Sequence, residues 1–266
     1  MNIKVNEIAR ETDEGKTLGE LADDLKPGSD LLILNGFPSR RETLLTEGDE
    51  VVFIKRGAIP AADELEALLV SRHTPGVHAK VKDAKVGVAG LGGLGSQVAV
   101  ALCRVGVGTL VLADFDVVEP SNLNRQQYFV DQLGARKTEA LSETLKRINP
   151  YVAIDARAVR LTPENIPEIF SGCSVVVEAF DRAEEKAMLV ETVLSRLPDA
   201  WMVAASGLAG HGPSETISCH RVGARFFVVG DLASEARPGL GLMAPRVGVA
   251  AHAQANLVLR LLLGEE

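Results

Sequence analysis

The stretch from Val86 to Gln127 decides the fold, and it reads VGVAGLGGLGSQVAVALCRVGVGTLVLADFDVVEPSNLNRQQ. An apolar run at 86–89 meets a glycine-rich turn, and a helical pattern follows from Ser96. A second apolar run at 109–113 then ends at Asp114. The order strand, glycine loop, helix, strand and acid is typical of a nucleotide-binding βαβ unit.

The glycine turn is suited to binding a phosphate. Gly90 and Gly92 allow a tight turn that brings bare backbone close to the ligand, and Gly95 lets the helix start close against the strand. The N-terminus of the helix stabilises an anion, and Asp114 can accept hydrogen bonds from ribose hydroxyls. Taken alone, this pattern favours an ordinary NAD-type Rossmann domain.

A polar segment after Asp114 favours a triphosphate over a dinucleotide. Asp116 comes first, and the run SNLNRQ at 121–126 brings Arg125 beside amide side chains. Arginine offers a rigid fork of donors to phosphate oxygens. A dehydrogenase has no evident need for such a cluster directly after its ribose acid.

Three motifs together carry a specific resemblance. GLGGLGS at 90–96, DFDVVEPSNLNRQ at 114–126 and GARK at 134–137 resemble the ThiF/MoeB family, relatives of the ubiquitin-activating enzymes. Members of that family adenylate the C-terminal glycine of a small ubiquitin-like sulfur carrier. The resemblance runs from about Arg72 to the C-terminus. It implies an α/β fold, namely a Rossmann-like ATP-binding domain with a mixed sheet.

The resemblance also implies a site for ATP and Mg²⁺. The expected nucleotide-binding residues are Gly90, Gly92, Gly93, Gly95, Asp114, Asp116, Asn122 and Gln126. The expected catalytic residues are Arg125 and Lys137, which bring positive charge to the phosphates, and Asp181, which holds Mg²⁺ with the basic Lys186 following it. Arg72 is expected to reach the triphosphate of the neighbouring subunit in a homodimer. Each of two residues also has a simpler explanation. Asp181 could act only as the N-cap of a helix at 182–196, and Arg72 could lie in a polar turn without contacting a ligand.

The chain has three cysteines, Cys103, Cys173 and Cys219, and no CxxC pair. A disulfide framework is therefore improbable. Many ThiF/MoeB relatives bind zinc through two CxxC pairs, and we predict no zinc here. Some relatives use a cysteine to form an acyl-disulfide with the carrier, and Cys219 is the only downstream candidate. Its place on an expected strand favours instead a buried thiol, and Cys103 and Cys173 are also expected in the core.

Residues 1–58 predict a separate small domain. Met1–Ala9 reads as a strand, Thr17 can cap a helix at 18–25 with Glu20 in a capping box, and strands follow at 31–34 and 51–54. This β-grasp pattern resembles the sulfur carrier ThiS. A carrier ends in a free Gly-Gly, whereas here the chain continues as KRGAIP at 55–60, so this domain cannot be the substrate.

The predicted domains are thus a ThiS-like β-grasp domain at 1–58, a helical connector at 59–82 and an adenylation domain at 83–266. The first domain is either a covering or docking domain, or a regulatory mimic that occupies the carrier site. His73 and His78, in the connector, have no partner at metal-ligand spacing and are expected at the surface.

Composition narrows the class of function. The 266 residues carry a net charge of −8, which argues against broad nucleic-acid binding. The chain shows neither a signal region nor an apolar run of about 20 residues, so no membrane contact and a cytoplasmic location are expected.

The predicted reaction is ATP-dependent adenylation of a ThiS-type carrier ending in Gly-Gly, in thiamin thiazole biosynthesis. The alternatives are a MoaD-type carrier, another carboxylate on a small molecule, peptide or modified tRNA, a non-catalytic carrier-binding scaffold, and an NAD dehydrogenase.

Overall fold

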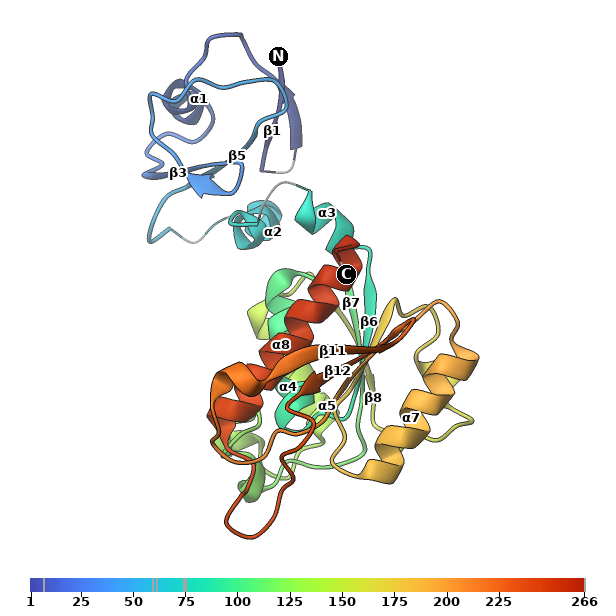
Figure 1. Ribbon diagram of the computed structural model, residues 1–266. Coiled ribbons are helices and arrows are strands. Elements are labelled where there is room, and N and C mark those ends of the chain that lie inside the picture. The colour runs from blue at the N-terminus through green and yellow to red at the C-terminus, as the bar shows by residue number, and fades with distance from the viewer. Residues whose placement is uncertain (7, 59, 61, 74–75, 266) are drawn as a thin grey trace. The chain divides into compact units, whose positions relative to one another are not determined.

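The computed structural model describes residues 1–6, 8–58, 60, 62–73 and 76–265. Contacts divide the chain into two units, Met1–Ala79 and Lys80–Glu266. The residues of the predicted connector up to Ala79 are grouped with the first unit. Figure 1 shows the elements of each unit with their labels.

The first unit is a β-grasp domain, as predicted. Its described strands are β1 (Asn2–Val5), β2 (Ile8–Glu11), β3 (Leu31–Leu34), β4 (Phe37–Pro38) and β5 (Glu50–Ile54), in the order β2-β1-β5-β3-β4. β1 and β5 are parallel and the other pairs are antiparallel. Helix α1 (Leu18–Leu25) begins with the predicted capping box of Thr17 and Glu20. The prediction of one strand across Met1–Ala9 was wrong, because Asn6 adopts φ 50° and the chain turns back as a hairpin.

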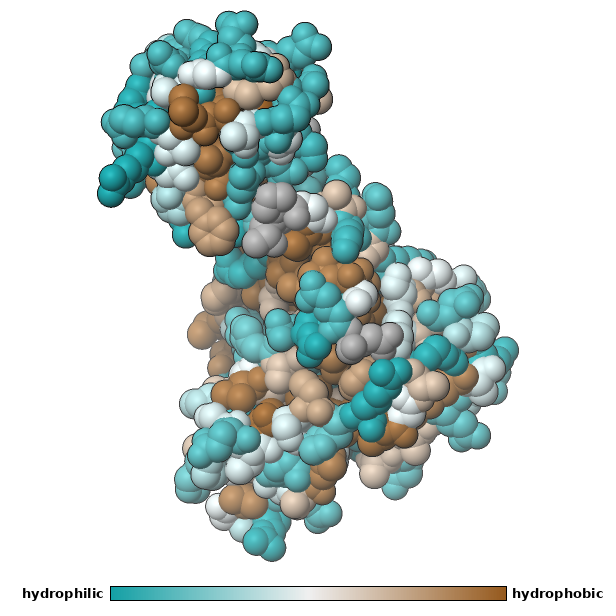
Figure 2. All heavy atoms as spheres, turned by 45° about the horizontal axis from the view of Figure 1, so that its top comes forward, coloured by the Kyte–Doolittle hydropathy of each residue, from teal (hydrophilic) through white to brown (hydrophobic). Residues whose placement is uncertain are grey.

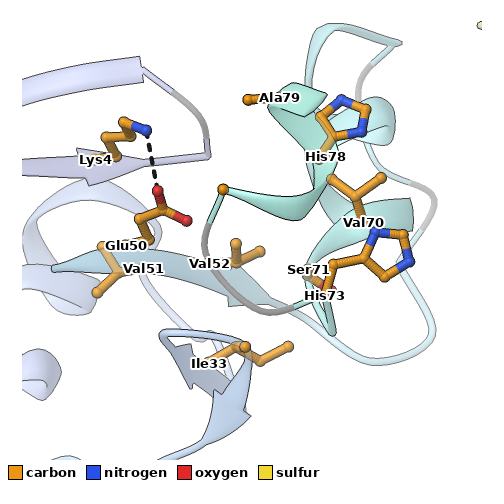
Figure 3. A pocket seen from close by; sticks show the side chains of 12 residues that line it. Lys4, Ile33, Glu50, Val51, Val52, Val70, Ser71, His73, His78 and Ala79 are labelled. Carbon is orange, nitrogen blue, oxygen red and sulfur yellow. Dashed lines mark hydrogen bonds and ion pairs between the residues drawn. The ribbon is translucent and has the colours of Figure 1, made fainter. Parts of the chain in front are cut away.

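The connector helix α2 (Ala62–Val70) belongs to this unit. Lys26 Nζ lies 2.8 Å from Glu64 Oε2, and His78 Nε2 lies 3.4 Å from Glu66 Oε1. Between β5 and the residues after α2 lies a cavity of about 30 Å³ (Figure 3). This volume suits one or two waters and no substrate. His78 is buried and His73 half-buried, so the expectation that both lie at the surface was wrong.

The second unit is a Rossmann-like domain with a mixed sheet, as predicted. Its described strands are β6 (Lys85–Ala89), β7 (Thr109–Ala113), β8 (Ala153–Arg157), β9 (Val175–Glu178), β10 (Trp201–Ala205), β11 (Ser218–Gly223) and β12 (Phe226–Gly230). They form a sheet in the order β11-β12-β10-β9-β6-β7-β8, in which only β11 is antiparallel to its neighbour. The strand order reverses between β6 and β9, which is the point where open α/β sheets bind ligands.

Helices cover both faces of this sheet (Figure 1). The helices α4 (Gly93–Val105), α5 (Lys137–Ile148) and α8 (Ala244–Leu263) share one hydrophobic core, and α6 (Ile166–Ile169) and α7 (Ala183–Arg196) share the other. A short helix, α3 (Val77–Val81), precedes β6. Apart from Lys85, Thr109 and Glu178 at their ends, the strands β6, β7, β9 and β10 are apolar, because both faces of these strands are buried.

On the face shown in Figure 2, hydrophilic side chains cover most of each unit, and hydrophobic side chains form smaller areas among the hydrophilic ones. Among the described helices, none has the length and apolar character needed to cross a membrane.

Candidate active site

The motif residues of the second unit gather at the carboxyl edge of the sheet, which is the lower edge of this unit in Figure 1. The glycine turn follows β6, Asp114 follows β7 and Asp181 follows β9. Because β9, β6 and β7 are neighbours in the sheet, adjacent strands about 4.8 Å apart bring these segments to one place.

The glycine turn has the backbone geometry that the motif predicts. Gly90 adopts φ +87°, and a Cβ there would lie 2.9 Å from the Ala179 carbonyl oxygen. Helix α4 begins at Gly93, three residues before the expected Ser96, because Gly95 sits in its first turn against the backbone. A Cβ on Gly95 would lie 1.8 Å from the Gly90 carbonyl oxygen. No described side chain caps this helix, so its N-terminus is suited to an anionic ligand.

Asp114 joins the glycine turn to the end of β7. Its Oδ2 accepts a hydrogen bond from Leu91 N at 2.7 Å, and its Oδ1 accepts one from Asp116 N at 2.8 Å. Each carboxylate oxygen can accept a further bond. The carboxylate can therefore hold the turn and still accept a ribose hydroxyl.

The polar segment that contains Arg125 is tied down onto the glycine turn. Ser96 Oγ accepts from Gln127 N at 3.1 Å, and Gln97 Nε2 donates to the Arg125 carbonyl at 3.1 Å. Tyr128 donates its hydroxyl to the Leu91 carbonyl at 2.8 Å, and burial raises the pKa of this phenol. Sequence reasoning did not assign these roles to Gln97 and Tyr128, since neither belongs to a glycine or phosphate motif. Together the three bonds fix Arg125 beside the start of α4.

In the described part of the chain, Arg125 and Gln126 each carry an unpaired buried polar atom: the donor Nε of Arg125 fits a phosphate, and the acceptor Oε1 of Gln126 fits a hydroxyl such as that of a ribose. Arg125 Nη1 donates to the Asn124 Oδ1 at 2.8 Å, but its buried Nε has no protein partner among the described residues. The buried Gln126 Oε1 is likewise unpaired within that set. Such atoms cost free energy unless a ligand or water pairs with them. Asn122 Oδ1 accepts from Glu119 N at 3.1 Å and so stabilises the local turn, and the role of Asn122 at a nucleotide stays a prediction.

Lys137 is the first residue of α5 and is 6% exposed. Its Nζ lies 3.1 Å from Asp116 Oδ2, and its backbone N–H donates to the Asp116 carbonyl at 3.0 Å. Asp116 therefore fixes both ends of the lysine. Because the carboxylate of Asp116 is half exposed, the ammonium of Lys137 can also interact with a phosphate at the open side.

Asp181 is exposed and lies three residues beyond β9. Its alternative role as an N-cap was wrong, because Arg182 occupies the N-cap position of α7. Lys186, expected to accompany Asp181, instead donates to both carboxylate oxygens of Glu178 at 2.9 and 3.0 Å. The sequence analysis did not identify Glu178, which also accepts from the backbone of Phe180 and Ala205 and shapes the turn that leads to Asp181.

The residues fit Mg²⁺ only as an ion shared with a nucleotide. Among the described residues, no group of three or more His, Cys, Asp or Glu side chains is arranged to hold a metal ion. Mg²⁺ is commonly bound by one or two carboxylates together with substrate phosphates and water. An exposed carboxylate at Asp181, near the phosphate-binding turn, suits this mode.

Two further predictions concern residues outside this cluster. Arg72 is exposed in the turn after α2, in the first unit, and its role at a triphosphate stays a prediction. Cys103 and Cys173 are buried as expected, but Cys219 is exposed, so the expectation of a buried thiol was wrong. The reason is that β11 is the edge strand of the sheet. Partial burial still raises the pKa of the Cys219 thiol, which disfavours a reactive thiolate.

A larger hollow lies at the opposite, amino-terminal edge of the sheet. It has a volume of about 630 Å³ and is lined in part by Phe170, Cys173, Trp201 and Leu261. None of the motif residues lines it. The chemistry-bearing groups therefore point to the carboxyl edge and not to this hollow.

Comparisons with known proteins find a family model for each part of the chain. Residues 66–266 match the family model "ThiF family", and residues 1–57 match "ThiS-like ubiquitin". The chain is 31% identical over 192 residues to the adenylyltransferase and sulfurtransferase UBA4 of Candida glabrata, covering 70% of this chain and 44% of that protein. It is 32% identical over 190 residues to the molybdopterin-synthase adenylyltransferase of Salmonella typhimurium, covering 68% of this chain and 74% of that protein.

Solved structures show the same fold. The tRNA N6-threonylcarbamoyladenosine dehydratase of E. coli, in complex with ATP, superimposes with a TM-score of 0.68 at 21% identity, covering 78% of this chain and 98% of that chain. The chain spans less than half the length of the two UBA4 relatives, at 44% and 47%. Because the family model matches well over half of the chain, the protein belongs to the ThiF family.

Proposed function

We propose that this protein adenylates the C-terminal carboxylate of a ubiquitin-like sulfur carrier that ends in Gly-Gly, using ATP and Mg²⁺ and releasing pyrophosphate. The observation that carries the proposal is the fixed position of Arg125, with its unpaired buried Nε, beside the uncapped start of α4. A dinucleotide has no third phosphate for this group to meet. The fold shared with an ATP complex in E. coli supports the same reading.

The reaction needs positive charge that offsets the negative charge of the reactants, and it needs no general base. A C-terminal carboxyl group has a pKa of about 3.5 and is ionised at neutral pH. It attacks the α-phosphate, the bond from that phosphorus to the bridging oxygen breaks, and pyrophosphate leaves with the electron pair. Bringing one anion to a polyanion is the main obstacle. Arg125 and Lys137 offset that charge, and Asp114 and the glycine turn orient the nucleotide.

Mg²⁺, when bound with ATP, would neutralise the leaving pyrophosphate. Asp181 is the residue that would hold it. Gln126 would orient a phosphate oxygen or the ribose.

The carrier class rests on the first unit and on the relatives. A fused ThiS-like domain favours a ThiS-type carrier and thiamin thiazole synthesis. The relatives named for molybdopterin synthase and for a modified tRNA make a MoaD-type carrier and another carboxylate the alternatives. The net charge of −8 disfavours tRNA. A non-catalytic scaffold would have no use for the Lys137–Asp116 arrangement.

We also propose that the protein works as a homodimer. Large apolar side chains near the site are exposed, with Val117 at 43%, Phe129 at 53%, Val130 at 73% and Leu133 at 40%. The backbone bond from Gly134 N to the Val118 carbonyl holds the segments that carry them side by side. A contiguous exposed apolar area is typical of a subunit interface. In this arrangement Arg72 of one subunit would reach the triphosphate of the other.

Exchange of labelled pyrophosphate into ATP tests the function. The assay is run without a carrier, with ThiS-type and MoaD-type carriers, and with each carrier shortened by its terminal Gly-Gly. We expect exchange that requires both an intact carrier and its terminal carboxylate, and the preferred carrier identifies the pathway. Tight ATP binding without exchange for any carrier would contradict the proposal and favour another carboxylate or a scaffold.

A further inference from the structure

A tyrosine that belongs to none of the sequence motifs holds the glycine turn from the core side. Tyr128 comes three residues after Arg125, and its ring lies in the same hydrophobic core as Leu91. Only 6% of its surface is exposed. Its hydroxyl donates to the Leu91 carbonyl at 2.8 Å. A phenylalanine would fill nearly the same space, so the hydroxyl group itself needs an explanation.

Leu91 is fixed through both of its backbone polar groups. Its N–H donates to Asp114 Oδ2 at 2.7 Å, and its carbonyl accepts from the Tyr128 hydroxyl. Its side chain is fully buried. The peptide units on either side of Leu91 are therefore each held in one orientation, the first by Asp114 and the second by Tyr128.

The orientation of the second peptide unit decides where the N–H of Gly92 points. In a trans peptide the carbonyl and the N–H lie in one plane and point in opposite directions. Because the Leu91 carbonyl points into the core, towards Tyr128, the Gly92 N–H points away from the core. None of the described residues accepts a hydrogen bond from this N–H. It is therefore available to a ligand.

The surroundings of Gly92 favour an anionic ligand. A Cβ on Gly92 would lie 3.8 Å from Gln126 Nε2, and a Cβ on Gly93 would lie 3.4 Å from Arg125 Cγ. The uncapped start of α4 follows directly. The Gly92 N–H, the N-terminus of the helix and the Arg125 guanidinium thus gather on one side of the turn. An anionic oxygen is the ligand that suits all three.

A neutral hydroxyl is well suited to this position. Burial raises the pKa of the Tyr128 phenol, and the negative charges of Asp114 and Asp116 raise it further. The group therefore remains a neutral donor at neutral pH. It fixes the turn without adding negative charge to a site that must receive phosphates.

We propose that Tyr128 is a positioning residue, whose hydroxyl orients the Leu91–Gly92 peptide so that the Gly92 N–H donates to a phosphate oxygen of the nucleotide. This inference rests on the proposed binding of ATP at the glycine turn. It predicts that loss of the hydroxyl weakens the binding of the phosphates and leaves the binding of the adenosine part unchanged.

Calorimetric titration of the full chain, with ATP and Mg²⁺ and separately with adenosine, tests this without a carrier. Tyr128→Phe removes one oxygen atom and keeps the ring in the core. We expect the Kd for ATP to rise about tenfold, as when one hydrogen bond to a charged oxygen is lost. The Kd for adenosine should stay within about twofold of the wild-type value. Tyr151→Phe is the matched control and should change neither constant, since this second tyrosine precedes β8 at the amino-terminal edge of the sheet.

A second measurement uses the wild type alone, so it decides the question even if Tyr128→Phe does not fold. Two-dimensional ¹H–¹⁵N spectra follow the amide of Gly92 during the same titrations. ATP should move its proton resonance downfield, because a hydrogen bond to an anionic oxygen deshields the proton, and adenosine should not. An unchanged Gly92 resonance at saturating ATP would overturn the inference.

The outcomes separate this inference from the proposed function. If Tyr128→Phe weakens the binding of ATP alone, the inference holds, whether or not a carrier supports pyrophosphate exchange. If the wild type is active in exchange but Tyr128→Phe binds ATP normally, or loses affinity for ATP and adenosine equally, only this inference is overturned. A wild type that does not bind ATP would overturn both.

Discussion

The nucleotide side of the second unit is built differently from the side that carries the two loops at 206–217 and 231–243, which hydrogen-bond to each other and which we call the paired loops. On the nucleotide side, short sequence motifs supply the chemistry, and backbone geometry at Gly90 and Gly95 permits close approach. On the paired-loop side, side chains distant in sequence, Asp231 and Arg246, hold two loops together. One side is specified locally and the other by tertiary contacts. Changes on the nucleotide side should therefore act mainly on activity, and changes in the paired loops mainly on stability.

Lys137→Ala should have the largest effect. Removing one preorganised charge at the phosphates lowers the rate of adenylation by about 10²-fold or more, while the KM for the carrier changes little. Lys146→Ala, at an exposed position in the last turn of the same helix, is the matched control. Pyrophosphate exchange measures both. A near-normal rate of exchange in Lys137→Ala would show that Lys137 does not stabilise charge at the phosphates.

Mixing two inactive variants tests whether the nucleotide side is shared between subunits. A mixed dimer has one Arg72→Ala subunit and one Lys137→Ala subunit. If Arg72 acts across the interface, the site of the Arg72→Ala subunit has its own Lys137 and receives Arg72 from the other subunit, so it is complete. An equal mixture should then recover about a quarter of wild-type activity, since half of the dimers are mixed and each has one complete site. No recovery after subunit exchange, checked by the mass of tagged mixed dimers, would assign Arg72 to the site of its own subunit.

Glu178→Gln tests a residue that lies between the two sides. Glu178 is fully buried and accepts from the Lys186 ammonium and from the backbone of Phe180 and Ala205. Burial raises the pKa of this carboxyl group, and Lys186 opposes that change. Removing the charge should cost about 2 kcal/mol of unfolding free energy, below the usual cost for a fully buried pair because Lys186 is partly exposed. Urea denaturation gives the value, with Glu184→Gln, on the exposed first turn of α7, as the control.

The smallest expected effect is the pH dependence of the paired loops. Burial opposes ionisation of Asp231, but hydrogen bonds from Ser234, Ala233 and Arg246 outweigh it and lower the pKa of this carboxyl group. Its contribution to stability is therefore present above the unfolded pKa of about 3.9 and is lost as the pH falls towards the lower folded value. The difference in Tm between wild type and Asp231→Asn should be constant from about pH 5 to 7 and shrink below about pH 4. A difference that grows on acidification would contradict this assignment.

The same contrast explains what the sequence could predict. The βαβ order, the capping box at Thr17 and the place of Asp114 follow from local patterns, and the structure bears them out. The start of α4 at Gly93 was missed because two glycines read as loop, whereas close packing needs them inside the first helical turn. The sequence could not predict that Cys219 is exposed, because the alternation of polar and apolar residues in a strand does not show whether that strand lies at the edge of the sheet.

The partners of Lys186 and Arg246 depend on contacts between residues far apart in the chain. Lys186 was expected to accompany Asp181, but the fold places Glu178 within its reach. Nothing near Arg246 in the sequence indicates the carbonyls of Gly212 and Pro213. Roles of this kind require the folded structure.

The way the chain continues after β5 has a kinetic consequence. Residues beyond Ile54 turn at Lys55–Ala58 and enter α2 within the first unit, so this carrier-like domain has no free tail. A carrier with a reactive tail, tethered to the enzyme that activates it, would be present at an effective concentration in the millimolar range. It would outcompete any separate carrier for the site. Under the proposed function, a tail that continues into a helix lets the fused domain remain attached without becoming a competing substrate.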